Sequence, residues 1–158
     1  AVRFTPSGEL SAAHSPQPPG AGASFGPMGL PTEAALVGAG AVPGAILRFG
    51  VSEIAKQHNV GPAAILALNV VGSFALGSLA GNGAARRANL LLGVGFCGAF
   101  TTFSTFSVDT LTMLQRGQNS RAAAYVLCSN LLSIGAAAAG HRLTLPPPIL
   151  RALRPPGG

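Results

Sequence analysis

Four long stretches of the chain carry almost no charge, and they constrain the fold more than any other feature of the sequence. They run over residues 34–49, 61–83, 88–113 and 122–140. A helix needs roughly 17 to 25 mostly apolar residues to cross a bilayer, and the last three stretches meet this length. The first is of marginal length, and Arg48 near its end is expected to extend to the membrane interface. The sequence therefore predicts an all-α integral membrane protein with four transmembrane helices.

The composition agrees with this class of protein. Charged residues make up 9% of the chain, whereas they make up about 25% of a typical soluble domain. A soluble four-helix bundle needs a polar face on each helix, and these stretches have almost none. The formal net charge of +6 does not indicate a nucleic-acid partner, because the basic residues stand singly or in pairs and form no stripe along a phosphate backbone.

The two ends of the chain differ from its apolar middle. Residues 1–32 are rich in Pro, Gly, Ser and Ala without an apolar period, which predicts a disordered segment. Met28, just before the first apolar stretch, is a candidate translation start. Residues 143–158 contain two proline runs that no helix crosses, and they predict a loose basic tail. The membrane domain is therefore expected over residues 33–142.

The orientation of such helices follows from the Lys and Arg residues near their ends. With four spans, both chain ends and the second connection share one side of the membrane. The basic residues on that side are Arg86, Arg87, Arg142, Arg151 and Arg154, and those on the other side are Arg48, Lys56, Arg116 and Arg121. This bias is small. It leaves open a chain that inserts both ways and packs as an antiparallel dimer, and a chain with one weakly preferred orientation.

Uncharged polar side chains recur inside the predicted spans. Asn69 lies in the second, a Thr- and Ser-rich run over 101–107 lies in the third, and Tyr125 and Ser129 lie one turn apart in the fourth. An unpaired polar group costs several kcal/mol in an apolar medium, so each of these needs a partner or a function. Proton-coupled transporters usually carry a carboxylate within a span, and here the acidic residues fall near span ends. The pattern indicates a passive path lined by hydroxyl groups.

The third span has two further features. Gly95, Gly98 and the adjacent hydroxyl residues weaken a helix, so either a break that frees carbonyls for a cation or a plain packing seam is expected. Phe103 and Phe106 are three residues apart and share a helix face. The positive edge of an aromatic ring can contact an anion weakly, although paired phenylalanines also serve as lipid-facing or core residues.

Three segments resemble motifs of the Fluc (CrcB) family of fluoride channels. They are the run GFCGAFTTFSTFS over 95–107, the first-span pattern Gly-Ala-x-x-Arg-Phe over 44–49, and Asn-Val-Val-Gly-Ser-Phe over 69–74. The resemblance covers residues 34–141. It implies a four-helix subunit with a broken third helix, in an antiparallel, dual-topology homodimer with two fluoride pores. It also implies a multi-pass protein of the cell (plasma or inner) membrane that lowers cytoplasmic fluoride by passive export.

The resemblance also implies roles for individual residues. Those along the fluoride path are Asn69, Phe103, Ser104, Phe106, Ser107, Thr110, Tyr125 and Ser129. Arg48 matches an arginine of the aqueous vestibule. The carbonyl groups of Gly98 and Thr101 match a structural Na+ site shared between subunits. Ile65 departs from the family, in which Thr is common at this position.

Other functions fit the sequence less well. A small dual-topology, proton-coupled multidrug antiporter needs a carboxylate in the middle of its first span, and this chain has none there. A channel subunit that requires a homologous partner has the same motifs, so the sequence leaves this alternative open. The sequence contains no cluster of metal ligands, no nucleophile paired with a base and no phosphate-binding loop, so we predict that the protein is not an enzyme.

Overall fold

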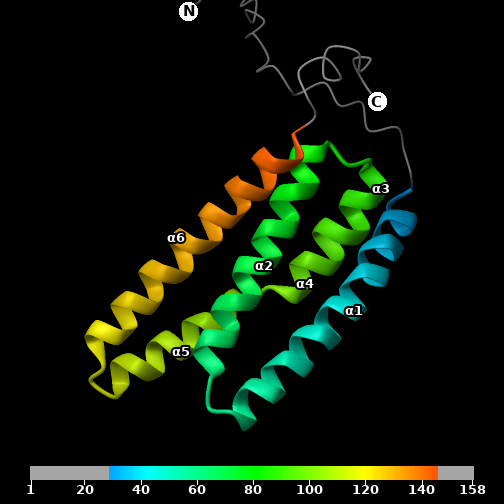
Figure 1. Cartoon of the computed structure of the whole chain (residues 1–158). Helices are drawn as coiled ribbons and strands as arrows, with labels where there is room; N and C mark the ends of the chain where they lie inside the picture. The colour runs from blue at the N-terminus through cyan, green and yellow to red at the C-terminus, as the bar shows by residue number, and fades with distance from the viewer. Residues whose placement is uncertain (1–28, 146–158) are drawn as a thin grey trace, which may run out of the picture. The chain divides into compact units, whose positions relative to one another are not determined.

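The computed structural model describes residues 29–145, which are helical except at short connections (Figure 1). Over this range four helical runs are long and apolar enough to cross a membrane. They are α1 (Leu30–Gln57), α2 (Gly61–Asn82), the run Arg86–Gln115, and α6 (Asn119–Thr144). The third run consists of α3 (Arg86–Ala88), the π-helical η1 (Asn89–Cys97), α4 (Gly98–Phe100) and α5 (Phe103–Gln115). The predicted all-α fold with four helices of membrane-spanning length is confirmed.

The predicted end segments lie mostly outside the described residues. Their inner ends are helical, because α1 already begins at Leu30 and α6 continues to Thr144. Pro31 stands in the first turn of α1, where its fixed φ suits a helix start. Leu145 has an extended backbone and precedes a proline, which disfavours the α conformation. The helical domain thus extends two or three residues beyond the predicted bounds at each end.

The first span is longer than predicted, and its predicted end at residue 49 is wrong. Helix α1 has 28 residues and ends at Gln57, so Arg48 lies within the helix. The added turns are held by packing, since Ala55 is buried and Val51 contacts the core. Lys56 also forms an ion pair with Glu53 at 2.6 Å. A search for apolar residues misses this part because it combines packed and charged positions.

Small residues allow the helices to form two close pairs, α1 with η1 and α2 with α6. A Cβ atom added to Gly95 would lie only 2.5 Å from the carbonyl oxygen of Val37. One added to Gly77 would lie 2.8 Å from the carbonyl carbon of Ala137. The backbones therefore approach more closely than any side chain would permit. Other buried glycines at these two contacts are Gly40, Gly44, Gly81 and Gly140.

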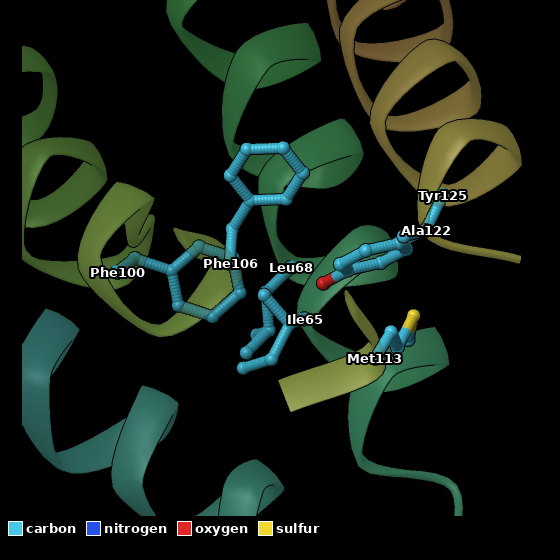
Figure 2. Packing of buried hydrophobic residues seen from close by; sticks show 7 residues of the cluster. All are labelled: Ile65, Leu68, Phe100, Phe106, Met113, Ala122 and Tyr125. Atoms are coloured by element: carbon cyan, nitrogen blue, oxygen red, sulfur yellow. The ribbon is translucent and has the colours of Figure 1, made fainter. Parts of the chain in front are cut away.

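A small apolar core joins α2, α4, α5 and α6 (Figure 2). Its buried members are Ile65, Leu68, Phe100, Phe106, Met113, Ala122 and Tyr125. Many large apolar side chains outside this core are exposed, among them Ile46, Phe49 and Leu131. Lipid tails are as apolar as these side chains, so such a surface suits a bilayer. The core places α5 against α6 and α2, next to the interruption between α4 and α5.

Candidate ion-binding pocket

The third helical run is interrupted at Thr101 and Thr102. Their backbones are extended, with φ and ψ of −79° and 157° at Thr101 and of −148° and 116° at Thr102. Thr102 then caps α5, because its Oγ1 accepts a hydrogen bond from the Thr105 N–H at 3.2 Å. Backbone groups released from a helix inside a membrane need other hydrogen-bond partners. Here two side chains from neighbouring helices supply these partners.

Asn69 of α2 pairs with both backbone polar groups of Thr102. Its Nδ2 donates to the Thr102 carbonyl oxygen at 3.1 Å, and its Oδ1 accepts from the Thr102 N–H at 2.8 Å. In an unbroken helix this N–H would bond to the Gly98 carbonyl four residues earlier. Asn69 therefore holds the extended segment in place. It also occupies the Thr102 N–H, which would otherwise bond to the Gly98 carbonyl oxygen. Its amide group keeps a second hydrogen for another acceptor.

Arg48 of α1 contacts the other side of the interruption. Its Nε donates to the Ala99 carbonyl oxygen at 3.0 Å. An unbroken helix would supply this carbonyl with the N–H of Phe103. The resemblance placed Arg48 in a vestibule, and the structure places its Nε at the end of α4.

A pocket of about 280 Å³ lies beside the interruption, between α2, α6 and the α4–α5 segment. The predicted site residues that line it are Asn69, Gly98, Thr101, Phe103, Phe106 and Ser129. Those that do not line it are Arg48, Ser104, Ser107, Thr110 and Tyr125. Among the residues that the structure describes, the lining holds no charged side chain. The fold thus brings an amide, hydroxyls, backbone groups and two aromatic rings into one uncharged pocket.

The two phenylalanines of the pocket touch each other but differ in burial. Their ring centroids are 5.5 Å apart at an interplanar angle of 42°, which confirms that they share a face. Phe106 is only 8% exposed and also packs against the Tyr125 ring, with the two ring centroids 5.2 Å apart. Phe103 is 77% exposed. The chain therefore fixes the Phe106 ring by packing and leaves the Phe103 ring largely uncovered.

The predicted hydroxyl groups fall into two kinds. Those of Ser107 and Thr110 donate to carbonyl oxygens one turn earlier, at 2.9 and 2.8 Å. The hydroxyl of Ser104 lies 3.2 Å from the capping hydroxyl of α5. In contrast, the Ser129 hydroxyl oxygen is buried without a hydrogen-bond partner within residues 29–145. The buried Tyr125 hydroxyl faces the Asp109 carboxylate of α5 and interacts with it. Ser129 is therefore the hydroxyl of this set with an unused donor.

Sequence reasoning missed several residues of this region. Thr102 was treated as one of a row of hydroxyls, although a Thr just before a helix signals an N-cap. Ser133 lines the pocket one turn after Ser129 on α6, and this spacing was a usable signal. Asn130, next to Ser129 in the sequence, also lines the pocket. Asp109 was placed near a span end. It lies within α5, and its carboxylate interacts with the buried Tyr125 hydroxyl.

Together, the fold and the pocket define a small multi-span membrane protein with an uncharged polar pocket next to an interrupted span. Comparison with known proteins gives a more specific assignment. The chain belongs to the CrcB family, since the family model described as "CrcB-like protein, Camphor Resistance (CrcB)" matches residues 35–141.

Curated relatives agree with this assignment. A protein of Synechococcus sp. strain CC9902, named fluoride-specific ion channel FluC 2, is 44% identical over 112 residues, covering 70% of this chain and 78% of the relative. A Bacillus cereus protein of the same name is 41% identical over 113 residues, covering 70% and 96%. A Rhodospirillum centenum protein named fluoride-specific ion channel FluC is 44% identical over 115 residues, covering 68% and 90%.

Proposed function

We propose that this chain forms a fluoride-selective channel of the cell membrane, which lowers cytoplasmic fluoride by passive export. The observation that carries the proposal is the pocket, which joins uncharged hydrogen-bond donors and aromatic rings beside a span interruption. The relatives named as fluoride-specific channels supply the identity of the ion.

The pocket suits a small, strongly hydrated anion. Such an ion enters a membrane only if other donors replace its water. The second amide hydrogen of Asn69 and the unused hydroxyl of Ser129 supply donors at the pocket. The ring of Phe106 adds a positive edge. None of these groups carries a charge, so the anion is held weakly enough to leave again, as conduction requires.

We further propose that the channel is an antiparallel, dual-topology homodimer. Phe103 is 77% exposed although it lines the pocket, so a second copy is the natural cover for this ring. In that assembly the interruption at Thr101 and Thr102 is the broken third helix of the family fold. Ser104, Ser107 and Thr110 then continue the path along α5, where their hydroxyl groups serve the anion as donors by leaving the hydrogen bonds in which they take part here.

A structural Na+ ion at the interruption is part of the same proposal. The available ligands fit, because the Gly98 carbonyl oxygen has lost the Thr102 N–H to Asn69 and the Thr101 backbone is extended. Gly98 and Thr101 both line the pocket. Unwound carbonyl groups are the ligands that broken membrane helices offer to Na+. When bound, such an ion would neutralise the carbonyl dipoles at the end of α4.

The alternative of a proton-coupled antiporter finds no support in α1. Its acidic residues are Glu33, in the first turn, and Glu53, in the last turns, so neither lies in the middle of the helix. The alternative of a subunit that needs a homologous partner is decided by the experiment below.

Fluoride efflux from proteoliposomes that contain only this purified chain tests the proposal. We expect efflux measured with a fluoride electrode to be fast and chloride efflux from the same vesicles to be absent. Comparable chloride flux would refute selectivity. No fluoride flux from folded protein would refute a self-sufficient channel and would favour the partner-dependent subunit.

A further inference from the structure

Arg48 makes a polar contact with the end of α4 that its expected vestibule role does not explain. It is the donor to the Ala99 carbonyl oxygen, at 3.0 Å. We infer that Arg48 is a positioning residue that caps the helix ending at Phe100 through its Nε–H, and that this hydrogen bond, not the positive charge, is what the channel requires. The transport readout of this inference rests on the proposed function.

The first step of the argument is the need for a cap. The last carbonyl groups of a helix have no intrahelical donor, and a buried carbonyl without a partner is unfavourable. The extended backbone at Thr101 and Thr102 removes the N–H that would serve Ala99. Here no polar side chain of the same helix takes over, and α1 supplies the donor instead.

The second step is the way in which the backbone brings Arg48 within reach. Gly44 lies one turn before Arg48, and a Cβ added there would lie 3.2 Å from the Cα of Phe96. The α1 backbone therefore runs against the third helical run at this level. From this position the side chain of Arg48 extends to Ala99, three residues further along that run. Gly44 and Arg48 thus act together, one by permitting close approach and the other by capping.

The third step is what the cap controls. Ala99 lies between Gly98 and the interruption, so fixing its carbonyl also fixes the direction of the neighbouring peptide groups. On the far side, Asn69 holds Thr102 with two hydrogen bonds. Side chains of α1 and α2 therefore clamp the interruption from both sides. Loosening the Arg48 clamp would disturb the pocket residues Gly98, Thr101 and Phe103 without touching a permeating ion.

Three substitutions separate the hydrogen bond from the charge. In Arg48→Gln the amide nitrogen follows three side-chain carbons, as Nε does in arginine, so the donor stays in place and the charge is lost. Arg48→Met has the same length without a donor. Arg48→Lys keeps the charge but moves the donor one atom further out.

We would measure fluoride efflux of the wild type and the three variants in proteoliposomes, and hydrogen exchange of residues 96–106 in the same preparations. If Arg48 acts as a cap, Arg48→Gln keeps flux within about threefold of the wild type, and Arg48→Met and Arg48→Lys lose about tenfold or more. Exchange over residues 96–106 is then faster in Arg48→Met than in Arg48→Gln.

The opposite order, with Lys active and Gln inactive, would overturn the cap and establish a role for the charge. Equal behaviour of Gln and Met in both measurements would also overturn it, because the two differ in the donor. Absence of flux in the wild type would refute the proposed function alone. Hydrogen exchange does not depend on transport and would still decide the role of Arg48.

Discussion

At the residue scale, Phe106 is the pocket ring that the chain holds most firmly. It is 8% exposed and packs against the Tyr125 ring (Figure 2). We predict that Phe106→Ile lowers fluoride efflux roughly tenfold or more, because isoleucine lacks the positive ring edge that an anion can contact. The free energy of unfolding in detergent should fall by only about 1 kcal/mol, since most of the apolar bulk remains. Efflux and thermal unfolding of the same preparation measure the two effects.

The matched control is Phe49→Ile. Phe49 lies on α1, is 64% exposed, and does not line the pocket. The same change of side chain there should leave efflux at the wild-type level. If Phe106→Ile also conducts like the wild type, the aromatic ring has no part in the ion path.

Much of the pocket could be predicted at this scale, because Asn69, Phe106 and Ser129 were singled out for their chemistry inside apolar spans. The hydrogen-bond partner of each side chain could not be predicted from the sequence. Whether a hydroxyl donates to its own helix, as in Ser107, or stays unpaired, as in Ser129, depends on side-chain rotation and on neighbouring helices. The partner of Arg48 depends on where the third run is interrupted. A shift of that point by one residue would present a different carbonyl.

At the element scale, the pairing of α2 with α6 depends on glycines whose backbones touch the opposite helix. A Cβ added to Gly140 would lie 2.7 Å from Ser78 Oγ and 3.0 Å from Ser78 N, and closer still to the Phe74 carbonyl oxygen. Gly140→Ala should therefore push the two helices apart and lower the free energy of unfolding by about 1 to 3 kcal/mol. Thermal unfolding in detergent and the recovery of folded protein measure this loss.

The control for this prediction lies on the same helix. Gly135 of α6 has no atom within 4 Å of an added Cβ. Because alanine favours a helix over glycine by up to about 1 kcal/mol, Gly135→Ala should be neutral or stabilising. Equal effects of the two substitutions would show that helix propensity, not the close contact, determines stability here.

The element boundaries show what composition can and cannot give. The apolar stretches located all four runs, because a bilayer requires their length. They did not locate the end of α1, because helix formation continues through Glu53 and Lys56, which pair with each other. Composition records where a chain is apolar, whereas the end of a helix depends on caps and packing, such as the left-handed Asn59 that follows α1.

At the scale of the whole molecule, the structure changes the charge balance that orients the chain. Arg48 lies inside α1 and bonds to Ala99, so it no longer counts among the loop residues. The start of α1, α3 and the end of α6 lie together at one end of the bundle (Figure 1). In the described residues, that end carries Arg86, Arg87 and Arg142, and the other end carries Lys56, Arg116 and Arg121. With Arg151 and Arg154, which follow α6 in the sequence and lie outside the described residues, the count on the first side is five against three. A bias this small leaves both orientations open, as the proposed antiparallel dimer requires.

The last prediction follows from this small bias. With C-terminal reporters that are active on one side of the membrane only, we expect molecules in both orientations. The variant Gln57→Lys, Gln118→Lys, Arg142→Gln, Arg151→Gln, Arg154→Gln adds two charges at the α1–α2 and α5–α6 connections and removes three from the other side, and it should insert mostly one way. Its fluoride flux should then be nearly lost, because an antiparallel pair needs both orientations.

Neutralising instead the end that holds these two connections, with Arg116→Gln and Arg121→Gln, should bias insertion the other way and also abolish flux. Both arginines are exposed, so neither variant is expected to impair folding. Expressing the two variants together supplies both orientations, and flux should return. Activity of either variant alone while it inserts in a single orientation would refute the antiparallel assembly. Failure of the mixture to recover, with both proteins folded, would show that the added or removed charges act on conduction itself and not on orientation.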